Sequence, residues 1–95
     1  MAGYVIADVT VEDPEQYAEY RRQVTPTLEQ YGGEFLVRGG EHDTLEGSWR
    51  PGRLVVIRFE SVEAARTWWS SAEYEGPRAL RQSISTGSLV VVEGA

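Results

Sequence analysis

Two segments of this chain, Leu54 to Ile57 and Leu89 to Val92, are apolar at four consecutive positions. Their aliphatic, mostly β-branched composition is typical of strands, and successive residues of a strand face opposite sides of a sheet. Both faces of these two strands therefore need shelter from water. A chain of 95 residues buries only about 60 to 65% of its unfolded surface, so it has little material for two covering layers. We predict a sheet with helices on one face and a second copy of the chain on the other, as a homodimer; the alternative is that a loop or the segment from Leu45 to Trp49 folds over that face.

The first third of the chain predicts a strand followed by a helix. Residues from Tyr4 to Val11 are mostly apolar and β-branched, which favours a strand. Asp13, Pro14 and Gln16 then form a helix start, with a capping carboxylate, a proline at the first helical position and a glutamine three residues after the cap. Apolar and aromatic residues follow at helical spacing up to the stop at Gly32 and Gly33, and Pro26 predicts a kink.

The remaining elements complete an alternating order. Glu34 to Arg38 predicts a second strand, and after a loop and a possible hairpin arm around Leu45 to Trp49 the run from Leu54 to Phe59 predicts a third. Ser61 and Ser71 each cap a further helix, the second of them with a possible break at Gly76 and Pro77, and a strand from Leu89 to Val92 ends the chain. The order predicts an α+β fold, a ferredoxin-like βαββαβ unit with a four-stranded antiparallel sheet, as one domain over residues 1–95.

Charge and residue usage exclude several classes of function. The net charge of −6 argues against nucleic-acid and membrane partners, which select clustered basic residues. All nine basic residues are arginines, so Schiff-base chemistry is excluded, and the absence of cysteine excludes thiolate nucleophiles and thiolate metal sites. No apolar run is long enough to cross a bilayer and the first residues do not form a signal peptide, so we expect a cytoplasmic protein.

Motifs along nearly the whole chain resemble one family of small bacterial proteins. They are Tyr4 to Val9, Asp13-Pro14 with Tyr17 and Tyr20, Tyr31-Gly32-Gly33, Phe35 to Gly40, Leu45-Glu46-Gly47 with Trp49, and Ala64-Ala65 with Trp68 and Trp69. The chain is similar in these to domain-of-unknown-function family 1330. That resemblance implies the dimeric α/β-barrel superfamily, in which two ferredoxin-like protomers press their sheets together and which includes cofactor-independent monooxygenases, haem-degrading enzymes, isomerases and stress-response proteins. One departure is Ala72, where the family pattern leads us to expect proline.

Arg38 is the first candidate for a functional side chain, because it ends a strand and precedes the flexible pair Gly39 and Gly40. It could bind an anionic ligand with its fork of donors. The other interpretation is a structural ion pair, in a charged cluster on the sheet with Asp8 and Arg58, and the residues alone favour this one.

Aromatic residues supply the next candidates. Tyr17, Tyr20 and Trp68 could line a pocket between helix and sheet, where they would bind a flat ligand and Tyr20 could transfer a proton. Their other interpretation, which we favour, is core packing. Trp68 and Trp69 are adjacent on a helix, so only one of them can face the sheet squarely, and we expect the other at a subunit edge or on the surface.

His42 is the only histidine and so the only side chain whose unperturbed pKa lies near neutrality. It could act as a general base, although a solvated loop residue is the more common case. Glu41, His42 and Asp43 lack the further ligands of a zinc site, and no phosphate loop or dinucleotide motif is present, so we predict no metal and no cofactor.

Three functions remain open from the sequence. The chain could be a cofactor-independent enzyme acting on a small anionic or polar organic molecule, with Arg38 as anchor and Tyr20 or His42 in proton transfer. It could be a ligand-binding or stress-response module without turnover. It could also be a structural dimer with a vestigial pocket. An open cavity would favour the first two, and a filled core the third.

Overall fold

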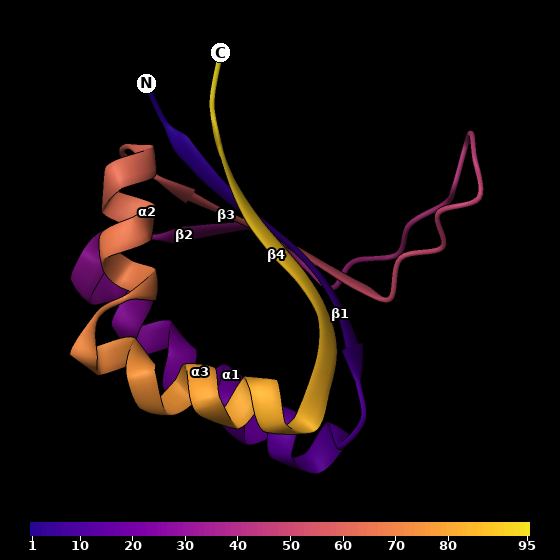
Figure 1. Ribbon diagram of the computed structural model, residues 1–95, viewed down its shortest axis with the longest axis horizontal. Coiled ribbons are helices and arrows are strands. Elements are labelled where there is room, and N and C mark those ends of the chain that lie inside the picture. Colours follow the sequence, from indigo (N-terminus) through magenta and orange to yellow (C-terminus); the bar gives the residue numbers. More distant parts are fainter.

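Four strands form a single antiparallel sheet in the order β2-β3-β1-β4. In the computed structural model, which describes all residues 1–95, the strands are β1 (Gly3–Val11), β2 (Glu34–Arg38), β3 (Arg53–Phe59) and β4 (Ser85–Glu93). The helices α1 (Pro14–Tyr31), α2 (Val62–Trp69) and α3 (Ala72–Ile84) lie together on one side of the sheet (Figure 1). The α+β ferredoxin-like arrangement predicted from the sequence is confirmed.

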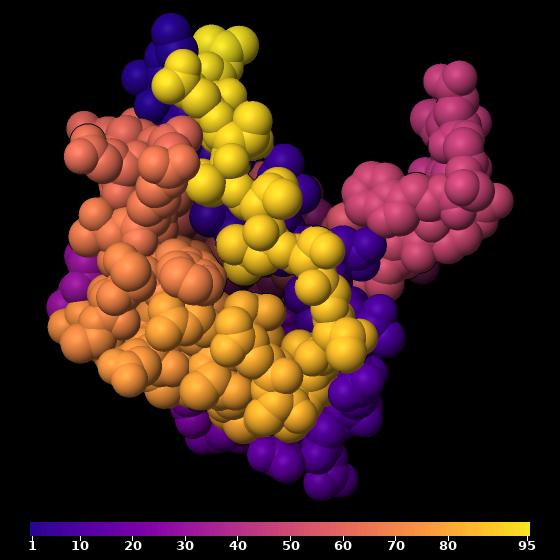
Figure 2. Space-filling model, in the orientation of Figure 1, coloured from indigo at the N-terminus to yellow at the C-terminus, as the bar shows by residue number.

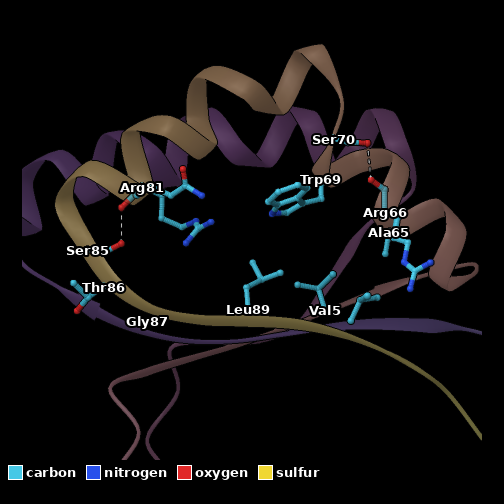
Figure 3. A pocket seen from close by; sticks show the side chains of 12 residues that line it. Val5, Ala65, Arg66, Trp69, Ser70, Arg81, Ser85, Thr86, Gly87 and Leu89 are labelled. Carbon is cyan, nitrogen blue, oxygen red and sulfur yellow. Dashed lines mark hydrogen bonds between the residues drawn. The ribbon is translucent and has the colours of Figure 1, made fainter.

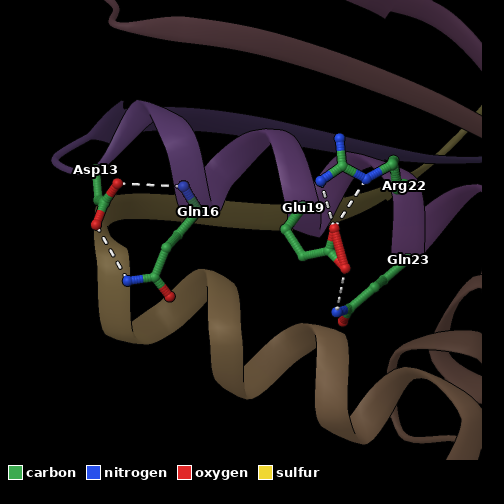
Figure 4. Close-up of polar contacts among 5 residues, drawn as sticks. All are labelled: Asp13, Gln16, Glu19, Arg22 and Gln23. Atoms are coloured by element: carbon green, nitrogen blue, oxygen red, sulfur yellow. Dashed lines mark hydrogen bonds and ion pairs between the residues drawn. The ribbon is translucent and has the colours of Figure 1, made fainter.

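Helix α1 begins and ends where the sequence places its caps. One carboxylate oxygen of Asp13 accepts a hydrogen bond from the backbone N–H of Gln16 at 3.1 Å, and the other accepts one from the side-chain amide of Gln16, also at 3.1 Å (Figure 4). At the other end Gly32 takes the left-handed conformation with φ 77° and closes the helix. On the exposed side Arg22 pairs with Glu19 at 2.5 Å, and this is the one ion pair in the structure (Figure 4).

One prediction about proline needs correction, because α3 runs from Ala72 to Ile84 without a break at Gly76 or Pro77. Helix α1 continues through Pro26 to Tyr31, and the kink predicted at Pro26 stays a prediction. Pro77 lies in the second turn of α3, where its missing N–H removes one helical hydrogen bond without ending the helix. No helix is both long enough and apolar enough to span a bilayer.

The face of the sheet toward the helices, hereafter the covered face, carries the hydrophobic core. Alternate residues of β1 and β3 point into it, and Phe59, Trp68 and Tyr74 are almost wholly buried there. The ring of Trp68 packs against both others, with centroids 5.4 Å from Phe59 and 4.1 Å from Tyr74. Trp69, one residue later, is 40% exposed, so only Trp68 is buried squarely against the sheet, as predicted.

The opposite, open face is apolar and has no covering layer. Val90 is 54% and Val92 46% exposed on β4. Loop 39–52 stands off on this side and protrudes from the body (Figures 1 and 2). It forms no strand, so the possible hairpin arm is wrong, and Leu45 at its tip is 92% exposed. Covering of the open face by this segment is also wrong, because Val90 and Val92 stay exposed. Trp49 at the base of the segment donates from Nε1 to Asp8 at 2.9 Å.

Candidate functional site

A groove of about 820 Å³ separates β4 from helices α2 and α3, hereafter the β4 groove (Figure 3). It lies on the covered face at the edge of the sheet, because β4 is the outermost strand and the helices above it do not close down on it. Its volume is in the range of small-molecule sites, which is about 300 to 1,000 Å³. The sheet and the two helices thus leave a ligand-sized opening beside a filled core.

The middle of the β4 groove is apolar. Val5 of β1 and Leu89 and Val91 of β4 face it from the sheet, and Trp69 and Ala65 of α2 face it from the other side. Figure 3 shows the Trp69 ring opposite Leu89 and Val5. This arrangement would hold a flat apolar group between an indole and aliphatic side chains.

Each end of the β4 groove carries an arginine. Arg81 of α3 lies at one end, near Ser85 and Thr86, and Arg66 of α2 lies at the other (Figure 3). Neither guanidinium pairs with a carboxylate, since the one ion pair joins Arg22 and Glu19. Arg81 and Arg66 therefore keep their charge available to a ligand in the groove.

Arg81 is held in place by two buried phenols. Its Nε donates to the Tyr74 hydroxyl at 3.4 Å, and that hydroxyl shares a 2.7 Å hydrogen bond with the hydroxyl of Tyr20. Burial alone would lower the pKa of Arg81, but its interactions with Tyr74 and Tyr20 outweigh burial and raise it. The guanidinium therefore stays charged at every pH at which the protein is folded. Burial, and then the nearness of Tyr74, raises the pKa of Tyr20, so this phenol stays neutral.

The polar groups of the groove are donors and neutral acceptors. Gln82, Ser70, Ser85 and Thr86 line it, and the Ser85 hydroxyl donates to the Arg81 carbonyl at 2.5 Å. No aspartate, glutamate or histidine lines the groove. It is thus suited to binding an anion and offers no side chain that would accept a proton near neutral pH.

The aromatic residues singled out from the sequence lie next to this groove but inside the core. Tyr17, Tyr20 and Trp68 are 6%, 7% and 1% exposed. The space enclosed among them is about 30 Å³, close to the volume of a single water molecule. Tyr20 reaches the β4 groove only through Tyr74 and Arg81, and Trp68 donates its indole N–H to Thr27 at 3.0 Å. Their direct contact with a ligand stays a prediction.

Arg38 lies at the other edge of the sheet and belongs to no ion pair, so the structural pair that the residues favoured is wrong. Its Nη2 donates to the Arg21 carbonyl and to the Thr25 hydroxyl, both at 3.3 Å. Asp8 instead accepts from Trp49 and from the Gly52 backbone. A bulge between Phe35 and Val37 turns Arg38 onto the covered face, whereas Asp8 is on the open face, so the two cannot meet.

His42 lies in loop 39–52, away from the β4 groove. It is exposed, and its Nε2 is 3.1 Å from the Pro51 carbonyl oxygen. No three histidine, aspartate or glutamate side chains come together closely enough to hold a metal ion. A role of His42 in proton transfer stays a prediction, and the structure does not bring it to Tyr20 or Arg38.

Three residues of the β4 groove were missed from the sequence: Arg66, Trp69 and Arg81. A signal for Arg81 exists, because it follows Tyr74 by seven residues and shares that residue's face of α3. Trp69 could have been assigned to a groove wall once Trp68 was assigned to the core. Arg66 carries no comparable signal, since an arginine on a helix is most often solvated.

Comparison with known proteins supports the fold and identifies a family. A family model described as Domain of unknown function (DUF1330) matches residues 2–95. No curated protein matches the chain.

Similar solved structures share the fold at low identity. RPA0582, a protein of unknown function from Rhodopseudomonas palustris, has a TM-score of 0.81 at 19% identity, over 99% of this chain and 82% of that one. SnoaB, a cofactor-independent oxygenase from Streptomyces nogalater, has a TM-score of 0.63 at 12% identity, over 99% and 92%. A dimeric ferredoxin-like protein of unknown function from Thermobifida fusca has 0.56 at 15% identity, over 100% and 91%.

Proposed function

The chain belongs to the DUF1330 family, and we propose that this member binds a small, flat organic acid in the β4 groove. The observation that carries the proposal is Arg81, a partly buried guanidinium that lines a ligand-sized groove and has no carboxylate partner. A charge in such a place costs desolvation, which an anionic ligand would offset with bidentate hydrogen bonds.

The groove also suggests how the ligand lies. Its carboxylate would meet Arg81, and its apolar body would lie between Trp69 and Leu89. Arg66 at the far end would favour a second polar or anionic substituent on the same molecule. The ligand class is therefore an aromatic or short aliphatic acid.

Binding without turnover is the function that the geometry favours over catalysis. The groove residues include no carboxylate or imidazole, and Tyr20, the nearest phenol outside it after Tyr74, is kept neutral by burial. Turnover in this groove would have to depend on the reactivity of the ligand itself. The fold of SnoaB is compatible with that alternative, but an identity of 12% supports only the fold.

We also propose that the protein acts as a homodimer through the open face. Apolar side chains of both outer strands are exposed, namely Leu36 and Val37 of β2 and Val90 and Val92 of β4. An apolar surface of this kind is typical of subunit contacts. The Thermobifida fusca neighbour is described as dimeric, which supports the proposal. Loop 39–52 projects on the same side, where it would flank the second copy.

The groove proposal is tested by thermal shift and calorimetry with a panel of benzoates, hydroxybenzoates and short alkanoates. We expect at least one acid to bind and to raise the melting temperature of the native protein. Arg81→Gln should weaken that acid by about tenfold or more. Arg50→Gln, which removes the same charge from loop 39–52, serves as the control and should bind within about twofold of the native protein.

Two results would contradict the proposal. One is the absence of binding across the panel, and the other is an acid that binds Arg81→Gln as tightly as the native protein. Any acid that binds is then incubated with the protein in air and followed by mass spectrometry. Formation of a product that depends on Arg81 would replace the binding function with the enzyme alternative.

A further inference from the structure

Three arginines without carboxylate partners meet in a cleft at the edge of the molecule opposite the β4 groove. The cleft, of about 510 Å³, lies between α1 and the edge formed by β2 and β3. We call it the arginine cleft; it is lined by Ala18, Arg21, Arg22, Thr25, Arg38 and Arg53. Four of the nine basic residues of an acidic chain thus line one cleft.

Arg38 is fixed in the cleft by neutral groups. Its guanidinium carbon lies 4.2 Å from the centroid of the Phe35 ring. The hydrogen bonds to the Arg21 carbonyl and the Thr25 hydroxyl both come from Nη2, so Nε and Nη1 keep their donors. The bulge in β2 creates this placement, because without it Phe35 and Arg38 would be on opposite faces of the sheet.

Arg53 is fixed by a cradle that glycine makes possible. Gly39 has φ 73°, and a Cβ at that position would overlap the Arg53 guanidinium. The Tyr17 ring lies on another side, with its centroid 5.4 Å from the guanidinium carbon. One bond, from Nη2 to the Arg38 carbonyl at 3.4 Å, is weak, and Nε is buried without any partner. Arg53 is therefore short of acceptors, which buried polar groups usually have.

Carboxylates do not neutralise this charge. Arg22 pairs with Glu19, but Arg21, Arg38 and Arg53 pair with no acid, although the chain has fifteen acidic residues. Like charges held close together repel one another, and a bound anion would remove that repulsion. Aromatic rings, carbonyl groups and Gly39 fix the positions of the guanidinium groups but leave some of their N–H donors without acceptors. This is the arrangement of a preorganised anion site.

From this geometry we propose that the arginine cleft binds a small polyanion that carries two or more phosphate or carboxylate groups. A monoanion would leave at least one of Arg38 and Arg53 uncompensated, whereas two anionic groups on one molecule can each accept a forked pair of hydrogen bonds. The site is separate from the β4 groove and does not depend on the function proposed for that groove.

Calorimetry at constant ionic strength tests this site with three probes: pyrophosphate, citrate and acetate. We expect pyrophosphate, citrate or both to bind with a dissociation constant of about 1 mM or lower, and acetate to bind at least about tenfold more weakly. Preference between the first two identifies the phosphate or the carboxylate source. Arg38→Gln and Arg53→Gln should each weaken the polyanion by about tenfold or more, and Arg50→Gln should leave it within about twofold.

Two glycine variants test whether the space beside Gly39 that holds the Arg53 guanidinium is needed for polyanion binding. Gly39→Ala displaces the Arg53 guanidinium and should weaken polyanion binding about as much as Arg53→Gln. Gly47→Ala is the matched control, because Gly47 has a similar φ of 84° and open space around its missing Cβ. Both variants incur the backbone strain of a left-handed residue, so a difference in affinity between them reports on Arg53.

The proposal is overturned if no polyanion saturates the native protein, or if Arg38→Gln and Arg53→Gln bind it unchanged. Sedimentation of the same variants gives an independent readout. If Arg38→Gln alters the oligomeric state while polyanion affinity stays at the native value, the cleft is a protein contact and the ligand site is refuted. Arg53→Lys should recover only part of the affinity, because lysine restores the charge without the planar fork.

Discussion

The two faces of the sheet carry similar apolar residues in very different surroundings. On β4, Val91 is partly buried among groove and core residues of the covered face, while its neighbour Val90 is 54% exposed on the open face. Burial also differs within the helix layer, between Trp68 at 1% exposure and Trp69 at 40% in the β4 groove. The apolar composition of a strand therefore does not determine by itself whether its side chains are buried. Their burial depends on whether another element covers that face of the sheet.

Burial on the two faces stabilises this small protein in two different ways. The covered face already draws free energy from burial against three helices, whereas the open face holds apolar area that only another chain could bury. Substitutions on the covered face should act on the free energy of unfolding of each protomer. Substitutions on the open face should act on association.

The largest effect is expected at Trp68. Trp68→Ala removes a fully buried indole that packs on Phe59 and Tyr74, and should lower the free energy of unfolding by about 3 to 5 kcal/mol. Trp69→Ala on the same helix should cost less than about 1 kcal/mol. Guanidinium denaturation followed by circular dichroism measures both. Equal losses of unfolding free energy in the two variants would show that the difference in burial does not set the contribution of each tryptophan to stability.

A substitution on the open face should act through the dimer. Val90→Glu places a charge in the proposed subunit contact, where it would be desolvated without a partner, and should raise the dimer dissociation constant at least about 100-fold. Analytical ultracentrifugation measures this. Ser83→Glu, on an exposed position of α3, adds the same charge and should leave association unchanged. A native protein that sediments as a 10.6 kDa monomer at micromolar concentration would contradict the proposed dimer contact on the open face.

Local signals in the sequence predicted most of the fold because their physics is local. Asp13, Ser61 and Ser71 cap the three helices through their own side chains, and Gly32 ends α1 in the left-handed conformation. The second strand was predicted with its observed bounds, Glu34 to Arg38. These features depend on residues within one helical turn, so no tertiary contact was needed to find them.

Three features that depend on contacts between distant segments were not predicted, although the antiparallel sheet itself was. The bulge in β2 is set by its pairing with β3, and one extra residue at Leu36 decides which face Arg38 occupies. Strand β4 begins at Ser85, four residues before the apolar run, because α3 leads into it directly and Ser85 to Ser88 pair with β1. The β4 groove exists because the helices stop short of the edge strand, which periodicity along the chain cannot show.

The smallest effect is expected from a hydroxyl in the core of the covered face. Tyr20→Phe removes the partner of the Tyr74 hydroxyl and should cost about 1 to 3 kcal/mol at neutral pH. Tyr4→Phe, on the open face, removes a hydroxyl with no hydrogen-bond partner and should cost less than about 0.5 kcal/mol.

The pH dependence of stability gives a further test of the Tyr20 hydroxyl. Burial and Tyr74 raise the pKa of Tyr20 in the folded state, so above about pH 10 the unfolded chain releases a proton that the folded chain keeps. Folded protein then binds more protons than unfolded protein, and stability falls as the pH rises above that value. Tyr20→Phe should flatten this fall in urea titrations between about pH 9 and pH 11. If stability falls with pH in Tyr20→Phe as steeply as in the native protein, then burial of Tyr20 does not cause the fall. The difference between the two faces would then depend on packing alone.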